Sequence, residues 1–272
     1  MYKPQDYLIY LEEFLDIYDN KIFTNLGGMR FNHAFALFSY LRLKQPENII
    51  ECGVYKGFST WVIENAIPNA NIHCVDIKLK NLEYRSKNAT YYETDFFGVD
   101  WSDINKKNTV CFFDDHQSHL KRILQTYWWG FKEIIFEDNF LDNEGDFYSL
   151  NQIFSTNGHS EFQLSKEFNK RSIKNKIYNK LELFFLEKNY WNQHLIQHPN
   201  QIDSKIIHNN IKKYFFIPPV YFVGDRELKV EQIYHYLTPE TKYKFDNFLN
   251  SIDKKNYNSE FGYNHFSVVE LN

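Results

Sequence analysis

Short apolar runs alternate with helix-like segments through the first half of the sequence. The runs cover residues 48–54, 71–77, 89–95, 108–115 and 132–139. Strands that read as nearly continuous apolar runs are typical of a parallel sheet buried on both faces. Because right-handed crossovers place helices on both faces, the pattern predicts an α/β fold with a doubly wound, Rossmann-like, mostly parallel sheet.

The segments before this core are expected to be helical. Residues 6–18 and 31–44 have helical periodicity, with the glycines of LGGMR between them. We therefore expect N-terminal helices over 1–45 and a cofactor-binding core over 46–140. The whole chain, 1–272, is read as a single domain.

The second half of the sequence reads differently. Residues 141–213 are polar and helix-biased, which indicates an insertion after the fifth strand that covers the site. Residues 214–272 are expected to complete the sheet. They are interpreted as a strand, a helix and a strand, at 214–223, 227–237 and 265–271. Pro218 and Pro219 weaken the first of these as a central strand.

Composition excludes several classes of protein. The formal net charge is −4 and no long span is strongly basic, so a nucleic-acid partner is not expected. No apolar run is long enough to span a membrane, and the N-terminus does not resemble a signal peptide. Cys52, Cys74 and Cys111 each lie in an apolar run, so we expect reduced, buried thiols and a cytoplasmic protein.

Acidic residues and glycines gather where the predicted strands end. In a doubly wound sheet, ligands bind in the crevice beyond the carboxyl ends of the strands. The residues at those ends are Glu51, Gly53, Asp76, Asp95, Asp114–His116 and Glu137–Asn139. This concentration predicts a binding site along one edge of the sheet.

A glycine loop, ECGVYKGFST, follows the first strand and opens a helix. Gly53 and Gly57 allow the backbone to approach a ligand closely, while Ser59 and Thr60 add hydroxyls at the helix N-terminus. The loop lacks the Gly-Lys-Ser/Thr ending of a phosphate loop, which argues against ATP. It also lacks the three-glycine spacing of a dinucleotide loop, which argues against NAD.

The spacing E-x-G-x-x-x-G-x-S resembles the first motif of class I S-adenosylmethionine-dependent methyltransferases. The resemblance implies S-adenosylmethionine as cofactor, with Asp76 holding the ribose hydroxyls and Asp95 near the adenine amine. Phe96 would pack on the adenine face. The full set of implied cofactor contacts is Glu51, Gly53, Val54, Tyr55, Gly57, Ser59, Thr60, Asp76, Asp95, Phe96 and Asp114.

The acidic clusters at the ends of the fourth and fifth strands raise a separate question, because converging carboxylates repel. Either a proton is retained between them or a cation neutralises them. Hard oxygen ligands of this kind suit Mg²⁺. Both alternatives are open from the residues alone.

Within the methyltransferases, these clusters resemble those of Mg²⁺-dependent sugar O-methyltransferases of the macrocin and mycinamicin type and a relative from cephalosporin biosynthesis. The resemblance covers about residues 48–139. It implies that Asp114, Glu137 and Asp138 bind Mg²⁺, and that His116 is the base that takes the acceptor's proton.

The sequence departs from that group at the fourth strand end. It has Asp-Asp-His where the sugar enzymes tend to have a glycine between two acids. Asp115 is therefore open as a ligand, as the base or as a partner that orients His116. His119, one helical turn after His116, is a rival base.

These observations favour a Mg²⁺-assisted O-methyltransferase acting on a small hydroxylated acceptor, first of all a sugar of a surface glycan or of a glycosylated metabolite. Open alternatives are a phosphorylated, phosphoramidate or nucleotide-linked acceptor, a catechol-like diol, and a catalytically silent binding subunit with a methyltransferase fold. A homo-oligomer is open as well, since the aromatic N-terminal helices offer an interface.

Overall fold

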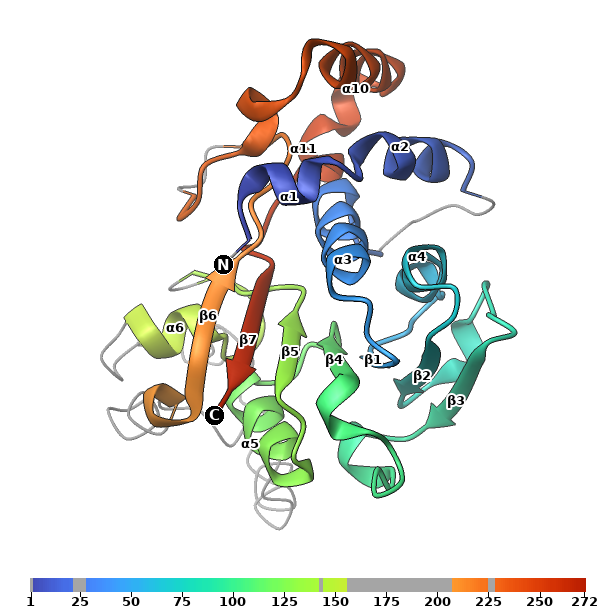
Figure 1. Ribbon diagram of the computed structural model, residues 1–272, viewed down its shortest axis with the longest axis vertical. Coiled ribbons are helices and arrows are strands. Elements are labelled where there is room, and N and C mark those ends of the chain that lie inside the picture. Colours follow the sequence, from blue (N-terminus) through green and yellow to red (C-terminus); the bar gives the residue numbers. More distant parts are fainter. Residues whose placement is uncertain (1, 22–27, 142–143, 156–206, 225–227) are drawn as a thin grey trace, which may run out of the picture.

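The computed structural model describes residues 2–21, 28–141, 144–155, 207–224 and 228–272. Strands within these ranges form one sheet in the order β3-β2-β1-β4-β5-β7-β6 (Figure 1). The strands are β1 (Asn48–Cys52), β2 (Asn71–Asp76), β3 (Ala89–Glu93), β4 (Thr109–Phe113), β5 (Glu133–Phe136), β6 (Ile211–Phe216) and β7 (Ser267–Leu271). The first five are parallel, and β7 runs antiparallel to both β5 and β6.

Helices precede, connect and follow the strands. The α-helices are α1 (Pro4–Leu8), α2 (Leu11–Asp19), α3 (Phe31–Lys44), α4 (Phe58–Ala66), α5 (His119–Trp129), α6 (Leu150–Ser155), α10 (Pro239–Ser251) and α11 (Tyr257–Glu260). The 3-10 turns are η1 (Leu79–Asn81), η2 (Phe96–Gly98), η3 (Lys106–Asn108), η5 (Ile233–Tyr236) and η6 (Lys254–Asn256). Within the described ranges, no helix has the length and apolar character needed to cross a membrane.

The sheet separates two buried layers. Ile49 of β1 packs in the layer that contains α3 and α4, whereas its neighbour Ile50 packs in the layer that contains Leu120 and Ile123 of α5. Successive side chains of a strand point to opposite faces, so alternation along a fully buried strand means that both faces are covered. The predicted doubly wound, mostly parallel sheet is confirmed.

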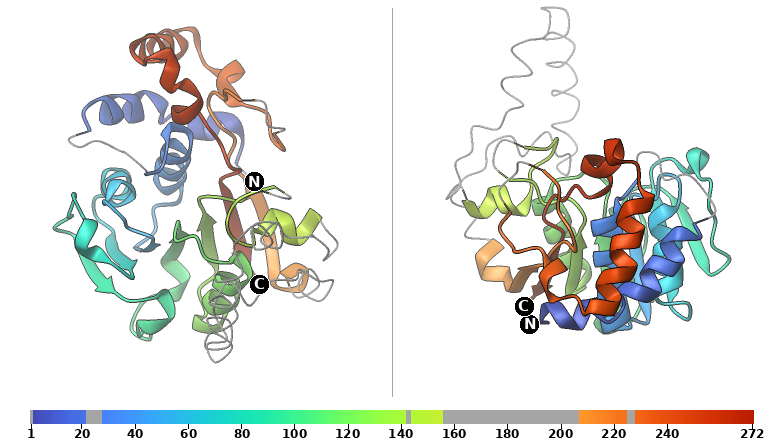
Figure 2. Two further views of the ribbon diagram at one scale, coloured as in Figure 1. Left: turned by 180° about the vertical axis from the view of Figure 1, so that it is seen from behind. Right: turned by 90° about the horizontal axis from the view of Figure 1, so that it is seen from above.

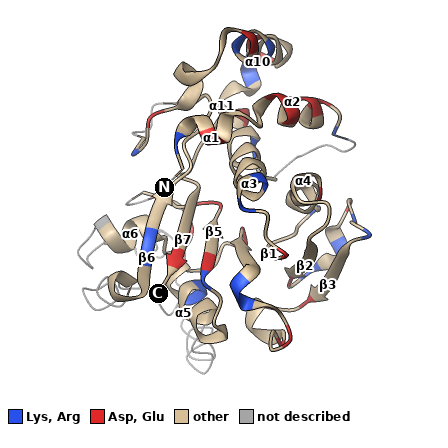
Figure 3. Ribbon diagram, viewed as in Figure 1, with Lys and Arg blue, Asp and Glu red and all other residues tan. Residues whose placement is uncertain are grey.

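The two ends of the chain meet in one helical layer. Figures 1 and 2 show α10 beside α2, beyond the end of α3. Lys244 Nζ of α10 lies 2.7 Å from Glu12 Oε2 of α2, and Figure 3 shows the acidic residues of α2 close to the basic residues of α10. Phe31 at the start of α3 packs against Phe245 and Phe248 of α10. This contact fixes α3, which reaches from the layer to the site.

The second half of the chain differs from several expectations. The helix expected over 227–237 is wrong for its described part, which holds only the turn η5; the buried Ile233 donates its backbone N–H to Pro219 instead, at 2.8 Å. The strand expected over 214–223 begins earlier and ends at Phe216, before the prolines, at the edge of the sheet. Most of the expected insertion lies outside the described residues, and the division of the chain into segments stays a prediction.

Candidate functional site

The glycine loop passes close to the end of β4. Gly53 has φ +93°, and a Cβ there would lie 2.1 Å from the backbone oxygen of Asp114. Gly57 has φ +92°, and a Cβ there would lie 2.4 Å from the backbone oxygen of Tyr84. Only glycine combines this conformation with such close approach. The loop is therefore held against the residues that follow β4 and β2.

Glu51 of β1 is hydrogen-bonded to the start of α4, directly after this loop. It is fully buried and accepts hydrogen bonds from the hydroxyls of Ser59 and Thr60, the latter at 2.6 Å. Burial raises the pKa of Glu51 above its usual range. Glu51, Gly57 and Thr60 do not line the cavity beside the loop, so the contacts expected of them with a cofactor are not placed there. Ser59 is at the cavity wall as well as in this network.

Asp76, at the end of β2, holds the loop from the other side. Its Oδ2 accepts hydrogen bonds from the backbone N–H groups of Val54 and Tyr55, at 2.9 and 3.0 Å. Its Oδ1 accepts one from Lys78, at 2.9 Å. Two carboxylate oxygens offer about four acceptor positions. Asp76 therefore keeps room for a donor from the cavity that it lines.

A first cavity of about 360 Å³ lies beside the loop. It opens between the ends of β1 and β4, where the strand order reverses and doubly wound sheets bind their ligands. Its size falls in the range of small-molecule sites. The residues expected to contact the cofactor that do line it are Gly53, Val54, Tyr55, Ser59, Asp76, Asp95, Phe96 and Asp114.

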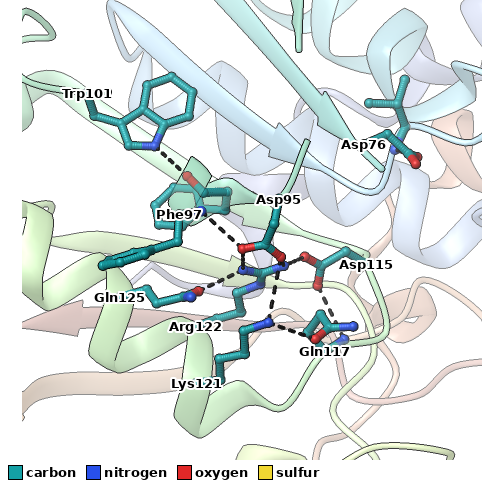
Figure 4. A network of polar contacts seen from close by, with 11 residues as sticks. Asp76, Asp95, Phe97, Trp101, Asp115, Gln117, Lys121, Arg122 and Gln125 are labelled. Carbon is teal, nitrogen blue, oxygen red and sulfur yellow. Dashed lines mark hydrogen bonds and ion pairs between the residues drawn. The ribbon is translucent and has the colours of Figure 1, made fainter. Parts of the chain in front are cut away.

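Arg122 of α5 links two of the predicted acids on the wall of this cavity (Figure 4). Its side chain is 2% exposed; Nη1 and Nη2 donate to the two oxygens of Asp95, at 3.1 and 2.8 Å. Nη2 also contacts Asp115. Burial alone would raise the pKa of Asp95, but the Arg122 hydrogen bonds and charge outweigh it and lower that pKa to about 2. Arg122 is thus the partner of both acids.

This pairing ties the side chain of Asp115 to Arg122. One carboxylate oxygen contacts Arg122, the other accepts from the backbone of Gln117 at 3.3 Å, and the side chain is 14% exposed. Both oxygens of Asp115 therefore already have a donor from the protein. The expectation that Asp115 is catalytic is not supported by this geometry, although Asp115 lines the first cavity.

His119 is not placed to act as the rival base. It is buried, its ring stacks on Phe136 at 3.7 Å, and its Nδ1 accepts the backbone N–H of Leu150 at 3.0 Å. Burial lowers its pKa to about 3. His119 lines neither the first cavity nor a second cavity, which contains the acidic clusters.

A second cavity of about 530 Å³ contains the acidic clusters. Asp114 from the end of β4 and the pair Glu137–Asp138 from the end of β5 all line it. Burial raises the pKa values of Asp114 and Glu137 well above the usual range, and repulsion from the neighbouring acids raises them further. The three predicted metal ligands therefore line one cavity, and their charges call for either protons or a cation.

His33 also reaches this centre, although no sequence pattern indicates it. Atoms of His33, Glu137 and Asp138 lie within 4.8 Å of one another. His33 lies on α3, 104 residues before Glu137, and its Nδ1 contacts Glu137 Oε1. In the sequence it is a single histidine in an apolar helical stretch, FNHAFALF. Only the docking of α3 brings it to the acids.

His116 stands at the mouth of both cavities. It has φ +53°, its side chain is 56% exposed, and its Nδ1 lies 3.0 Å from Asp146 Oδ2. The hydrogen bond with Asp146 raises the pKa of His116 to about 9, against a smaller opposing effect of burial. Asp146 is a second residue that the sequence did not indicate, because it lies in the polar stretch after β5.

The two cavities share part of their walls. Gly28, Met29, Asp114 and His116 line both. A molecule in the first cavity and a molecule in the second would therefore meet beside a carboxylate and an imidazole. Such an arrangement suits the transfer of a group between two bound molecules, with a proton acceptor at the point of transfer.

No protein-family model matches the sequence, and no curated protein matches it. Among solved structures, the chain is similar to CmcI without ligand, at 16% identity and a TM-score of 0.31, over 38% of this chain and 50% of that one. It is similar to the Podospora anserina methyltransferase PaMTH1 bound to SAH, at 14% identity and a TM-score of 0.32, over 48% of this chain and 61% of that one.

A third similar structure is CmcI with Mg and SAM, at 14% identity and a TM-score of 0.31, over 45% of this chain and 64% of that one. The chain thus spans between half and two thirds of the length of these three structures. Likeness at this level carries no argument about activity, which has to be inferred from the sheet, the two cavities and their residues.

Proposed function

We propose that the protein is an S-adenosylmethionine-dependent O-methyltransferase that uses a divalent cation, Mg²⁺, to bind and activate a hydroxyl of a small acceptor. The observation that carries this proposal is the meeting of two cavities at Asp114 and His116. One contains the glycine loop, and the other contains the carboxylate centre.

The first cavity fits an adenosyl group. Asp76 has acceptor capacity left for a ribose hydroxyl. Phe96 offers an apolar wall for a base, and the carboxylate of Asp95 is held beside it by Arg122. The backbone at Gly53 can lie against the ligand because no side chain intervenes.

The carboxylate centre fits a hard cation. Asp114, Glu137 and Asp138 supply oxygen ligands, and a divalent cation would offset the desolvation and repulsion that raise the pKa values of Asp114 and Glu137. When bound there, Mg²⁺ would act as a Lewis acid toward a hydroxyl of the acceptor. Because Mg²⁺ keeps coordination positions that the protein does not fill, two adjacent hydroxyls of a sugar could occupy them.

His116 is the proposed base. Asp146 holds its Nδ1, which leaves Nε2 to accept the proton of the acceptor hydroxyl as the methyl group passes from sulfonium sulfur to that oxygen. The products are a methyl ether, the neutral thioether of the cofactor and a protonated His116. Residues around the junction of the cavities contribute by holding the two reacting groups in line.

A sugar is the first candidate acceptor, in a surface glycan or a glycosylated metabolite. Asn258, Ser259 and Asn264 line the second cavity and offer the hydrogen bonds that hydroxyls need. Arg30 lines it too. Its guanidinium is the observation that favours the second candidate, a phosphorylated, phosphoramidate or nucleotide-linked acceptor, because arginine binds phosphate through paired hydrogen bonds.

Transfer of label from methyl-tritiated S-adenosylmethionine to a panel of sugars, sugar phosphates, nucleotide sugars and catechols tests the proposal. Label should appear in an ether in the presence of Mg²⁺ and disappear with excess EDTA or in Asp138→Ala. Transfer that survives both treatments would reject the metal. S-adenosylhomocysteine should also raise the melting temperature where NAD does not; the opposite result would favour a dehydrogenase. Binding without transfer to any acceptor would favour a silent binding subunit.

A further inference from the structure

Two residues outside the predicted ligand set, His33 and Asn264, border the carboxylate centre. His33 Nδ1 contacts Glu137 Oε1, and the backbone N–H of Asn264 donates to His33 Nε2 at 3.0 Å. The side-chain amide of Asn264 donates to Asp138 Oδ1 at 2.8 Å. The backbone oxygen of Asn264 accepts the N–H of Asn139 at 2.7 Å. One residue of the loop before β7 therefore holds both the imidazole and the acidic pair.

The contact with Asn264 fixes the position of the imidazole proton. A backbone N–H can only donate, so the nitrogen that faces it, Nε2, must present its lone pair. A neutral imidazole carries its proton on the other nitrogen, which is Nδ1. Nδ1 therefore faces Glu137 as a hydrogen-bond donor, and its lone pair is not available to a cation.

We propose that His33 is a positioning residue for the metal centre and not one of its ligands. It donates to Glu137 Oε1 and so turns Oε2 toward the cation, while Asn264 does the same for Asp138. The centre then has an all-oxygen ligand set from Asp114, Glu137 and Asp138, which selects hard cations such as Mg²⁺ and Mn²⁺. This inference rests on the metal site of the proposed function.

The competing arrangement makes His33 a ligand, because its Nδ1 lies near enough to Glu137 and Asp138 to share a cation with them. That arrangement requires the proton to move to Nε2, where it would face the N–H of Asn264. His33 is buried at the wall of the second cavity, and the rings of Tyr263 and Phe266 pack against it at centroid distances of 5.3 and 5.9 Å. Ligation by His33 would therefore need the loop at 263–266 to move away.

Mn²⁺ bound to the full-length protein distinguishes the two arrangements. Electron–nuclear double resonance measures the coupling of ¹⁴N to the ion, and His33→Asn assigns any signal by comparison with the wild type. The proposal expects identical spectra, without a directly bound nitrogen that depends on His33. A strongly coupled nitrogen that is lost in His33→Asn would overturn it and leave the metal site intact. Failure of the wild type to bind Mn²⁺ would instead overturn the metal site itself, and this inference with it.

Affinity for Mn²⁺ gives a second, independent readout. Asparagine places an amide donor near the position of Nδ1, so His33→Asn should keep its affinity for Mn²⁺ within about threefold of the wild type. Phenylalanine cannot donate, so His33→Phe should lose about 10- to 100-fold in affinity, the usual range for a residue that orients metal ligands. Equal affinity of His33→Phe and the wild type would contradict a positioning role. Far-ultraviolet circular dichroism confirms that each variant is folded. The double-resonance spectrum of the wild type is informative by itself, since the proposal expects no directly bound nitrogen from His33 in it.

Discussion

Gly53 is the residue at which the backbone of the site is most constrained. A side chain there would meet the backbone oxygen of Asp114, in addition to the strain of its positive φ. Gly130, at the end of α5, is a matched control, since it has φ +81° with open space around its missing Cβ. Gly130→Ala should lose about 1 kcal/mol of unfolding free energy from conformation alone. Gly53→Ala should lose clearly more, and should also weaken binding of S-adenosylhomocysteine.

Urea unfolding of the two variants measures this difference. Equal losses would show that the approach of the loop to Asp114 is not tight, and the argument for backbone contact with the cofactor would fail at that point. A Gly53→Ala protein of wild-type stability that binds normally would contradict both parts of the prediction.

The pairing of His116 with Asp146 makes a second prediction at the level of single residues. Their hydrogen bond raises the pKa of His116 to about 9, so the imidazole of the free protein is protonated at pH 7 and becomes a base only as the pH rises. Asp146→Asn removes the anionic partner, so the pKa of His116 should fall toward the ordinary value of about 6.5. Titration of the His116 ring signals by NMR checks this directly. An unchanged pKa in Asp146→Asn would mean that another group controls His116.

At the scale of elements, α5 is joined to the ends of the sheet by Arg122. Arg122→Met would leave Asp95 and Asp115 facing each other without their cation. Removing one partner of a buried ion pair costs about 3–5 kcal/mol, and we expect the lower end because Asp95 is 35% exposed. Arg42→Met is the control: its pair with Glu13 is partly exposed, with side chains 25% and 44% exposed, and should be worth less than about 1 kcal/mol. Chemical unfolding that shows equal losses would contradict the structural role of Arg122.

Elements also show why some of the structure was predictable. Strands β1 and β4 are buried at every position, so their apolar runs stood out in the sequence. The segment at 227–237 has apolar residues at helical spacing. However, its buried Ile233 donates its backbone N–H to Pro219, which lies outside the segment. Tertiary contact decided its structure against local preference.

The site divides in the same way. Asp114, Glu137 and Asp138 were predictable as a group because the ends of adjacent parallel strands lie at one edge of the sheet. His33 and Asp146 were not, because their places depend on how α3 and the loop after β5 dock. The partners of Arg122 were not predictable either, because a cation on a helix pairs with whichever acids the fold brings near. Strand-end residues are thus fixed by topology, and their partners by packing.

For the whole molecule, buried histidines should make stability depend on pH. Burial lowers the pKa values of His33 and His119 to about 4 and about 3, below the value of about 6.5 in the unfolded chain. At these two histidines, the unfolded state therefore binds more protons than the folded state below pH 6.5. Each histidine contributes stability that is fully present above that pH and falls by about 1.4 kcal/mol per pH unit as the pH drops toward its folded-state value.

Comparison of the wild type with His119→Gln isolates one of these contributions. The raised pKa values of Asp114 and Glu137 act in the opposite sense, but both acids are present in both proteins. Between pH 7 and pH 5, the unfolding free energy should fall less steeply in His119→Gln than in the wild type. The difference in slope should approach the value for about one bound proton. Parallel curves would show that His119 is not kept neutral by the fold.

The central claim concerns the molecule as a whole: one cavity binds the cofactor and the adjoining carboxylate centre binds the metal. Calorimetric titration with S-adenosylhomocysteine, in Mg²⁺ and again in EDTA, tests it most directly. We predict binding to the wild type under both conditions and binding at least about tenfold weaker to Asp76→Ala, which loses the carboxylate that faces the cavity. Absence of binding to the wild type, or equal binding by Asp76→Ala, would contradict the account at the glycine loop on which it is built.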